Sequence, residues 1–375
     1  MRFLLLSLTY LALYGGLHAY VAHRALRAFP RLRAEVVAAP FAVLAVFPLA
    51  ERLLERGNLW SAPLPLRQLA YGWMGFVFLV ASLLLASDLL GWGFSGLTRR
   101  RAGRTWARWR LGLALTLASF LAWQAWLTAR QPMVKEVVIS SPKVPASAGE
   151  VRIVQLADIH LGPMLDAERL ERIIALATAA RPDLLVATGD VVDGQLRHLN
   201  GFSGRFARIP ASLGKFAILG NHEFYVGAAH SAEFLGSAGF TMLRGERRQP
   251  LGWLAVLGVD DTAADGNGQR QGVSEAVLLR ETPPRVFTLL LKHRPRLSGA
   301  QGTVADLQLS GHTHGGQLFP FGLLVRLFFP LPTGLLALGD GKHLYTSLGA
   351  GTWGPAMRLL APPEVTLIRL RHGEG

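Results

Sequence analysis

The strongest constraint on this chain is that much of its first third is too apolar for a soluble fold. Half of the 375 residues are hydrophobic. Three apolar runs, at 3–22, 69–90 and 111–129, each approach the ~20 residues that a helix needs to cross a hydrocarbon core of about 30 Å. Lipid offers backbone polar groups no partner, so such runs must be helical. We therefore predict a transmembrane region over residues 1–130.

A fourth apolar run, at 36–54, is ambiguous. It contains Pro40 and Pro48, and it reaches spanning length only by including Glu51 and Arg52. It fits a fourth span, or instead a re-entrant or interfacial helix. The first run resembles a signal peptide at its start, but its full-length apolar core and the spans that follow favour a retained anchor. We expect three to four transmembrane helices.

The net charge of +14 belongs mainly to this apolar region. Residues 1–150 hold 17 Lys and Arg against 6 Asp and Glu, which leaves 22 against 19 in residues 151–375. The later part is therefore nearly neutral, which argues against nucleic acid as a partner. The chain has no cysteine, so disulfides and thiolate metal ligands are excluded.

Arginines in the connecting segments predict the orientation in the membrane. Four lie at 24–33 and six at 99–110. Cytoplasmic connections carry such an excess of positive charge. A last crossing over 111–129 would then deliver everything after Arg130 to the outside. We predict a multi-pass protein of the cytoplasmic (inner) membrane whose C-terminal domain lies on the outer, periplasmic face.

The character of the chain changes after residue 130. Residues 131–150 are rich in Pro, Ala and Ser, as linkers are, although Val134 to Ser140 could form an edge strand. From Val151 on, short apolar runs alternate with polar loops and helical patterns, which predicts an α/β sandwich over 151–375. We expect strands at 151–157, 184–188, 216–219, 254–259, 286–291, 307–309, 344–348 and 365–370.

Residues of the metal-ligand type follow five of these expected strands. They are Asp158-Ile159-His160, Gly189-Asp190, Gly220-Asn221-His222-Glu223, His293, and the loop Gly311–Gln317 with His312 and His314. Sheets of α/β proteins place their ligands beyond the carboxyl ends of strands. Each cluster alone is more often a turn or a cap, but five in succession indicate a metal site. The glycine-flanked turn lets His312 and His314 converge on neighbouring points, which suits two ions.

These motifs, in this order, resemble those of the calcineurin-like metallophosphoesterases: Asp-x-His, Gly-Asp, Gly-Asn-His-Glu, a single His, and Gly-His-x-His. The resemblance covers about residues 150–370. The closing Gly-Gly-Gln, Asp260-Asp261 and Pro362-Pro363-Glu364 are similar to the membrane-attached bacterial branch in particular. The resemblance implies a four-layer α/β sandwich and a metal-dependent phosphoesterase activity.

The resemblance also implies a role for each motif residue. Asp158, His160 and His314 resemble the ligands of a first metal, and Asn221, His293 and His312 those of a second, with Asp190 bridging both. The set of oxygen and imidazole ligands suits two divalent transition metals such as Mn, Fe or Zn. Water held between two such ions would lose a proton near neutral pH and attack phosphorus in line.

Four further residues receive roles around this metal set. The resemblance implies that His222 faces the leaving group as a catalytic acid or electrostatic stabiliser. Asp193 and Glu223 are interpreted as groups that orient the ligating side chains. Arg358 is a candidate for contact with the substrate phosphate, as are Lys292 and Arg294.

The segment 318–338, directly after the metal loop, is too apolar for a free surface loop. It either packs over the edge of a sheet or dips into the outer leaflet and presents lipid head groups to the metals. The resemblance implies hydrolysis of phosphate mono- or diesters, and the membrane region favours a small-molecule, lipid or envelope substrate. Two alternatives are a pyrophosphatase acting on a nucleotide-linked acyl sugar, of the UDP-diacylglucosamine type, and a non-catalytic metal-binding membrane scaffold.

Overall fold

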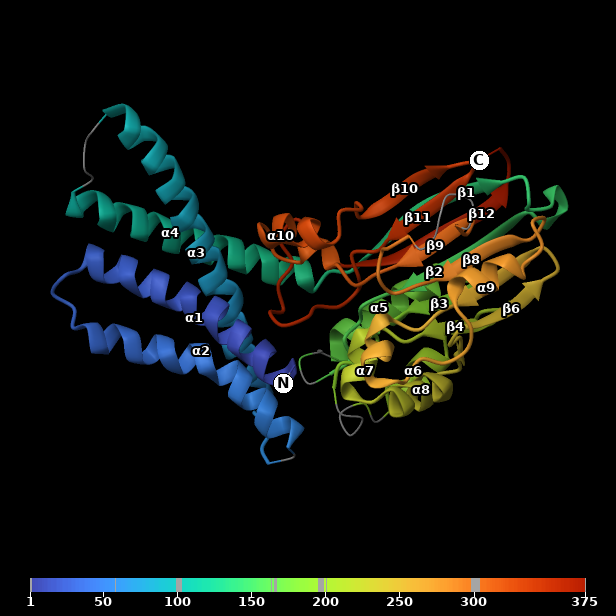
Figure 1. Ribbon diagram of the computed structural model, residues 1–375, viewed down its shortest axis with the longest axis horizontal. Coiled ribbons are helices and arrows are strands. Elements are labelled where there is room, and N and C mark those ends of the chain that lie inside the picture. Colours follow the sequence, from blue (N-terminus) through green and yellow to red (C-terminus); the bar gives the residue numbers. More distant parts are fainter. Residues whose placement is uncertain are drawn as a thin grey trace. The chain divides into compact units, whose positions relative to one another are not determined.

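A computed structural model describes residues 2–374 apart from 58, 99–102, 163, 165, 166, 195–198, 200 and 298–303. The chain divides into two compact units (Figure 1). The helical unit comprises Met1–Leu127 with Gly354–Met357, and the sheet unit comprises Thr128–Trp353 with Arg358–Gly375. Part of the predicted cytoplasmic connection, Arg99 to Arg101, lies outside the described residues.

The helical unit contains four long helices: α1 (Arg2–Ala28), α2 (Ala34–Arg56), α3 (Leu64–Thr98) and α4 (Arg104–Ala129). Among the described residues, three stretches are long and apolar enough to cross a membrane, namely Ala34–Glu55, Leu64–Trp92 and Arg104–Ala129. The ambiguous run at 36–54 is therefore long enough to span, because α2 continues through both Pro40 and Pro48. The predicted span at 3–22 lies in α1, and its crossing stays a prediction.

Charged side chains on these apolar helices are paired with one another. Asp88 on α3 forms an ion pair of 2.9 Å with Arg24 on α1 and another with Arg110 on α4. Tyr20 donates a hydrogen bond of 2.6 Å to the same carboxylate. An isolated charge in lipid is costly, and these contacts neutralise Asp88. They also join α1, α3 and α4 to one another.

The sheet unit is built from two six-stranded sheets. The first has the order β1-β12-β2-β3-β4-β5, and the second has the order β10-β11-β9-β8-β7-β6. The first comprises β1 (Met133–Ser141), β12 (Glu364–His372), β2 (Glu150–Leu156), β3 (Leu184–Thr188), β4 (Lys215–Ile218) and β5 (Thr241–Met242). The second comprises β10 (Gly334–Gly339), β11 (Lys342–Thr346), β9 (Leu307–Ser310), β8 (Phe287–Leu291), β7 (Leu254–Gly258) and β6 (Glu246–Leu251).

Each of the eight expected strands is present in these sheets. The segment left open as linker or edge strand contains β1, which pairs in parallel with β12 at the edge of the first sheet. Three strands were not expected, β5, β6 and β10. The first has only two residues, and β6 begins with the polar run Glu246-Arg247-Arg248-Gln249, so neither has a strand-like apolar pattern.

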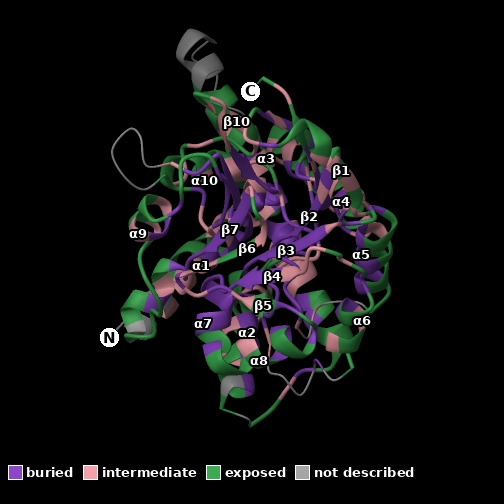
Figure 2. Cartoon of the chain, turned by 90° about the vertical axis from the view of Figure 1, so that its right-hand side faces the viewer, coloured by how far each residue is buried: buried purple, intermediate pink, exposed green. Residues whose placement is uncertain are grey.

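Three apolar clusters separate four layers, which confirms the predicted α/β sandwich. Side chains alternate between the faces of a strand, so Ile153 packs between the two sheets whereas Val154 packs on the opposite face. That outer face is covered by α5 (Ala167–Ala179), α6 (Ser203–Ala207), α7 (Asn221–Val226) and α8 (Ala228–Ser237). The second sheet is covered by α9 (Glu275–Arg280). The central strands are buried (Figure 2).

Parallel pairing brings the site loops to one end of the sandwich. Strands β2, β3 and β4 are parallel in the first sheet, as are β7, β8 and β9 in the second. The two sheets are linked near this end, where Gln155 donates a hydrogen bond of 3.0 Å to the carbonyl of Ser310. The loops that follow five of these strands therefore meet across the two sheets.

Candidate metal centre

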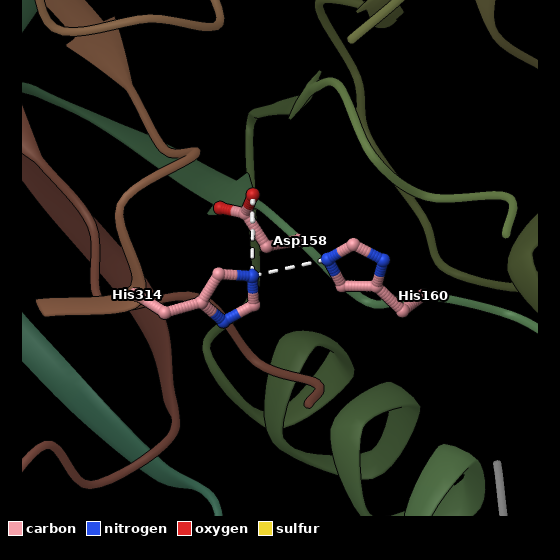
Figure 3. Close-up of side chains that lie close together, drawn as sticks. All are labelled: Asp158, His160 and His314. Carbon is pink, nitrogen blue, oxygen red and sulfur yellow. Dashed lines mark hydrogen bonds and ion pairs between the residues drawn. The ribbon is translucent and has the colours of Figure 1, made fainter. Parts of the chain in front are cut away.

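Asp158, His160 and His314 form the first group of possible ligands (Figure 3). The Nε2 atoms of His160 and His314 are 3.0 Å apart, and Nε2 of His314 lies 3.8 Å from Oδ1 of Asp158. Two ligands ~2.1 Å from one ion and at right angles to each other lie about 3 Å apart. The three buried side chains are therefore spaced as ligands of one ion would be.

Asp190, His293 and His312 form a second group, which Asn221 joins. Nε2 of His293 lies 3.1 Å from Oδ2 of Asp190, 3.1 Å from Nδ1 of His312 and 3.2 Å from Oδ1 of Asn221. The Nδ1–H of His293 donates to the carbonyl of Thr188 at 2.9 Å. This hydrogen bond fixes the ring and directs Nε2 toward the group, as the outer hydrogen bond of a metal-ligating histidine does.

The two groups are neighbours, because one backbone hydrogen bond connects them. The N–H of His312, in the second group, donates to both carboxylate oxygens of Asp158, in the first, at 2.9 and 3.0 Å. Asp190 belongs to the second group by distance, and its Oδ1 accepts the N–H of His222 at 2.9 Å. The structure thus brings together all seven predicted ligands from five loops.

Charge in the second group favours a cation. Burial acts to lower the pKa of His293, but the carboxylates of Asp190 and Asp158 outweigh burial and raise the pKa to about 10. Burial likewise acts to raise the pKa of Asp190, yet the neighbouring imidazoles, His293 above all, hold it well below its usual range. The buried Asp190 carboxylate therefore attracts positive charge, which a metal ion supplies as well as a proton does.

The two imidazoles of the Gly311–Gln317 loop, His312 and His314, are held neutral. Burial, reinforced by the charge of His293, lowers the pKa of His312 to about 2. Burial and the charge of Arg358 hold the pKa of His314 well below its usual value. Neutral imidazole is the form that binds metals, so both rings of the Gly311–Gln317 loop are in the ligating state.

Strained backbone is concentrated at the candidate ligands. Nine non-glycine residues in the described part of the chain have positive φ, and five of them are ligands: Asp158, His160, Asp190, His312 and His314. Such a conformation costs on the order of 1 kcal/mol or more per residue and persists only where the surroundings enforce it. Its clustering here supports this region as the candidate functional site.

Two motif glycines allow the ligand loops to approach each other. A Cβ atom at Gly220 would lie 2.2 Å from Oδ1 of Asp190, and one at Gly311 would lie 2.1 Å from Oδ2 of Asp158. Neither distance is possible for real atoms, so any side chain at these positions would displace a candidate ligand. The glycines of Gly-Asn-His-Glu and Gly-His-x-His are therefore required by packing.

Glu223 touches backbone rather than the two groups. Its fully buried carboxylate accepts the N–H groups of Asp190, Val192 and Gly220 at 2.8 to 2.9 Å. Burial, reinforced by the charge of Asp190, raises its pKa to about 7. Glu223 thereby fixes the loop that carries Asp190 to the loop that carries Asn221.

His222 lies beside the two groups and is held by Asp193. Its Nδ1 is 2.7 Å from Oδ1 of Asp193, and its Nε2 is 4.0 Å from Oδ2 of Asp190. Burial acts to lower the pKa of His222, but the charges of Asp193 and Asp190 outweigh it and raise the pKa to about 9. Asp193 also lies 3.4 Å from Nδ1 of His160, but its hydrogen bond is to His222.

The structure gives Arg358 different contacts from the predicted phosphate contact. Its side chain is fully buried and donates to the carbonyls of Gly351 at 2.6 Å and Leu348 at 2.7 Å. The nitrogen that donates to Gly351, Nη2, also lies 2.9 Å from Nδ1 of His314. Arg358 therefore supports a candidate ligand from behind.

Lys292 and Arg294, the other two phosphate candidates, form ion pairs with acidic side chains. The Lys292 ammonium lies 2.7 Å from Glu275, and the Arg294 guanidinium lies 2.7 Å from Asp261. Arg294 is partly exposed next to His293, whereas Asp261 is buried. Of the two acidic residues that follow β7, Asp260 and Asp261, the second is thus the ion-pair partner of Arg294.

Three aromatic residues around the site were not predicted from the sequence. Tyr225 and Trp353 lie with their ring centroids 5.6 and 5.9 Å from that of His222, and Phe329 lies 4.9 Å from His312. Tyr225 shares a helix with His222, which was a usable signal. Trp353 and Phe329 come from distant loops, so only the fold reveals them.

Comparison with known proteins gives consistent matches. Residues 151–316 match the profile of the calcineurin-like phosphoesterase family. The chain is 41% identical over 243 residues to an uncharacterized metallophosphoesterase of Aquifex aeolicus, a match that covers 64% of this chain and 92% of that protein. It is 33% identical to an uncharacterized metallophosphoesterase of Campylobacter jejuni, covering 64% of each chain. It is 32% identical to a transmembrane protein with metallophosphoesterase domain of Danio rerio, covering 69% of this chain and 62% of that protein.

The packing at Gly220 gives a direct test of the site geometry. We expect Gly220→Ala to displace Asp190 and to lower the bound metal per chain to roughly half or less, because ligand placement determines metal affinity. Metal content would be measured by mass spectrometry on manganese-supplied protein, with thermal unfolding to verify folding. The matched control is Gly236→Ala, since a Cβ at Gly236 meets nothing within 4 Å. Unchanged metal content in a folded Gly220→Ala protein would contradict the described site.

Proposed function

The chain belongs to the calcineurin-like phosphoesterase family, and we propose that its sheet unit hydrolyses phosphate mono- or diesters with two divalent transition metals. The observation that carries this proposal is the pair of adjacent ligand groups joined by the His312 N–H and the Asp158 carboxylate. One group alone would suit a structural ion. Two neighbouring groups suit a site that contacts a phosphoryl group from two directions.

The residues present fit such a metal pair. Asp158, His160 and His314 would hold one ion, and Asn221, His293 and His312 the other, with Asp190 between them. The two buried groups contain imidazole and oxygen donors at ligand-like spacing, which suits Mn, Fe or Zn. When bound, a metal pair supplies charge stabilisation to the phosphoryl group and lowers the pKa of an attacking water.

The protein's own contribution to the reaction centres on His222. Its raised pKa keeps a proton on the ring at neutral pH, and Asp193 orients that ring through Nδ1. The Nε2–H is then available to donate to the oxygen of the leaving group as the ester bond breaks. Glu223 and Arg358 act behind the ligands by holding the Asp190 loop and the His314 ring in place.

The proposed substrate and orientation rest on the apolar helices and their arginine-rich connections. The arginine-rich connections support a multi-pass arrangement in the cytoplasmic membrane with the sheet unit on the outer face. A lipid or another envelope phosphoester is then the accessible substrate. The intact His222 and the complete ligand set favour catalysis over a non-catalytic metal-binding scaffold. The nucleotide-linked acyl-sugar pyrophosphatase remains the second enzymatic candidate, and it requires the opposite orientation.

The acid role of His222 can be separated from a structural role by leaving-group chemistry. We expect His222→Ala to lower the hydrolysis rate of an alkyl phosphoester by roughly 10²–10⁴-fold while metal content stays unchanged. The loss should shrink for nitrophenyl esters, because nitrophenolate leaves without a proton. His230→Ala, on the exposed start of α8, is the control. An equal loss on both substrates would instead assign His222 a structural role.

The orientation can be tested by reporter fusions that need opposite compartments. We expect alkaline phosphatase fused after residue 140 to be active, because that enzyme folds outside the cytoplasm. Green fluorescent protein at the same point should be dark if the spans export it. A bright fluorescent fusion with an inactive phosphatase fusion would place the domain inside, and would make the nucleotide-linked pyrophosphatase the better proposal.

A further inference from the structure

Helix α10 (Phe321–Phe328) has the composition of a core helix, yet none of its eight residues is buried. Leu327 and Phe328 are 75% and 72% exposed, and Leu323 and Leu324 are 56% and 52% exposed. Phe321 and Leu335 extend the same apolar area. A helix of this length is marginal in water without tertiary burial, so exposed apolar residues in such number indicate an interaction surface. We call these six residues the α10 surface.

The two charged side chains placed at helix α10 itself are both basic. From Gly311 to Gly339 the chain has no Asp or Glu and a single basic residue, Arg326. Arg326 is exposed, and exposed Arg296 lies 5.1 Å over the ring of Phe329 at the end of the helix. Apolar residues flanked by arginine fit an anionic lipid surface, where the ring and alkyl groups enter the acyl boundary and the guanidinium groups meet phosphate.

The short connection between α4 and β1 favours a bilayer as the partner of the α10 surface. Helix α4, which is long and apolar enough to span a membrane, ends at Ala129, and β1 begins at Met133. The three residues between them can extend about 10 Å. The sheet unit is therefore tethered at a membrane boundary, and a bilayer is present at high local concentration without any further partner.

The α10 surface is joined rigidly to the candidate metal loop. A Cβ at Gly316 would lie 2.2 Å from Cα of Gly322, so the start of the helix sits directly on the loop that carries His312 and His314. At the other end of α10, Phe329 contacts His312 with ring centroids 4.9 Å apart. If α10 inserted into lipid, the Gly311–Gln317 loop would therefore lie at the level of the head groups.

We propose that the α10 surface inserts into the head-group and acyl boundary of a phospholipid bilayer and so presents interfacial phosphoesters to the metal centre. Interfacial helices reach a depth of roughly 5–10 Å. Leu327 and Phe328, the two most exposed residues of α10, would enter the bilayer to that depth. The insertion stands on the α10 surface alone. The choice of interfacial phosphoesters as substrates rests on the proposed function.

Insertion can be measured directly because the chain has no cysteine, so a single introduced cysteine is labelled uniquely. Full-length Leu327→Cys would carry an environment-sensitive NBD fluorophore in nanodiscs of phosphatidylcholine and phosphatidylglycerol. We expect emission shifted to the blue and at least ~twofold quenching by lipids brominated on the acyl chain. Val273→Cys, a 45% exposed apolar position of the same unit, is the matched control and should stay unquenched.

Two results would overturn the insertion. A Leu327 label that emits as in water shows a surface without an occupant. A blue-shifted label that brominated lipid does not quench shows that protein, either the helical unit or a second copy, covers the surface instead. Neither readout depends on catalysis, so failure of the proposed function would leave this test intact.

The presentation of lipid phosphoesters to the metal centre can be tested by acidic substitutions at the end of α10. We expect Leu327→Glu with Phe328→Glu to lower hydrolysis of phosphatidic acid in vesicles about tenfold, since acidic residues resist insertion. Hydrolysis of soluble nitrophenyl phosphate should stay within about twofold, because neither residue belongs to the metal centre. Val273→Glu is the control. Equal activity of the paired variant on vesicles would contradict presentation by α10, whereas inactivity of the unmodified protein on both substrates would contradict the proposed function itself.

Discussion

The hydrogen bond from the His312 N–H to the Asp158 carboxylate is the contact on which the site depends. Asp158 follows β2 of the first sheet, and His312 follows β9 of the second. The contact forms only because the intervening Gly311 has no side chain, since a Cβ there would lie 2.1 Å from Oδ2 of Asp158. Through this bond, one loop from each sheet places its ligands in adjacent groups. The packing of the two sheets thus determines the geometry of the candidate metal centre.

Contacts around the site offset the backbone strain of the candidate ligands. Five candidate ligands adopt positive φ, at a cost on the order of 1 kcal/mol or more each. Glu223 offsets part of that cost by accepting the N–H of Asp190, and Arg358 does so by donating to the carbonyl of His314. A ligand that binds only the folded state adds stability by mass action. Metal binding and the rigidity of these loops are therefore expected to support each other.

Most of this fold was predictable from the sequence, because long apolar runs and ligand residues at strand ends are local signals. The strand after which Asp158 stands, for example, is visible in the run 151–157. The contacts that were not predictable depend on distant segments. Arg358 is an ordinary arginine in the sequence, and only the fold brings it to His314. The 318–338 segment left two alternatives open, because its composition suits a core as well as a membrane surface, and the exposure of α10 favours the second.

The central claim is that the two groups hold two ions close enough to interact. Electron paramagnetic resonance of purified, manganese-loaded protein tests it most directly, combined with metal analysis of the same sample. Ions about 3.5–4 Å apart under a shared carboxylate should give two manganese ions per chain and the broad, split spectrum of a spin-coupled pair. One ion per folded chain, or a six-line spectrum of isolated manganese at full occupancy, would contradict the account.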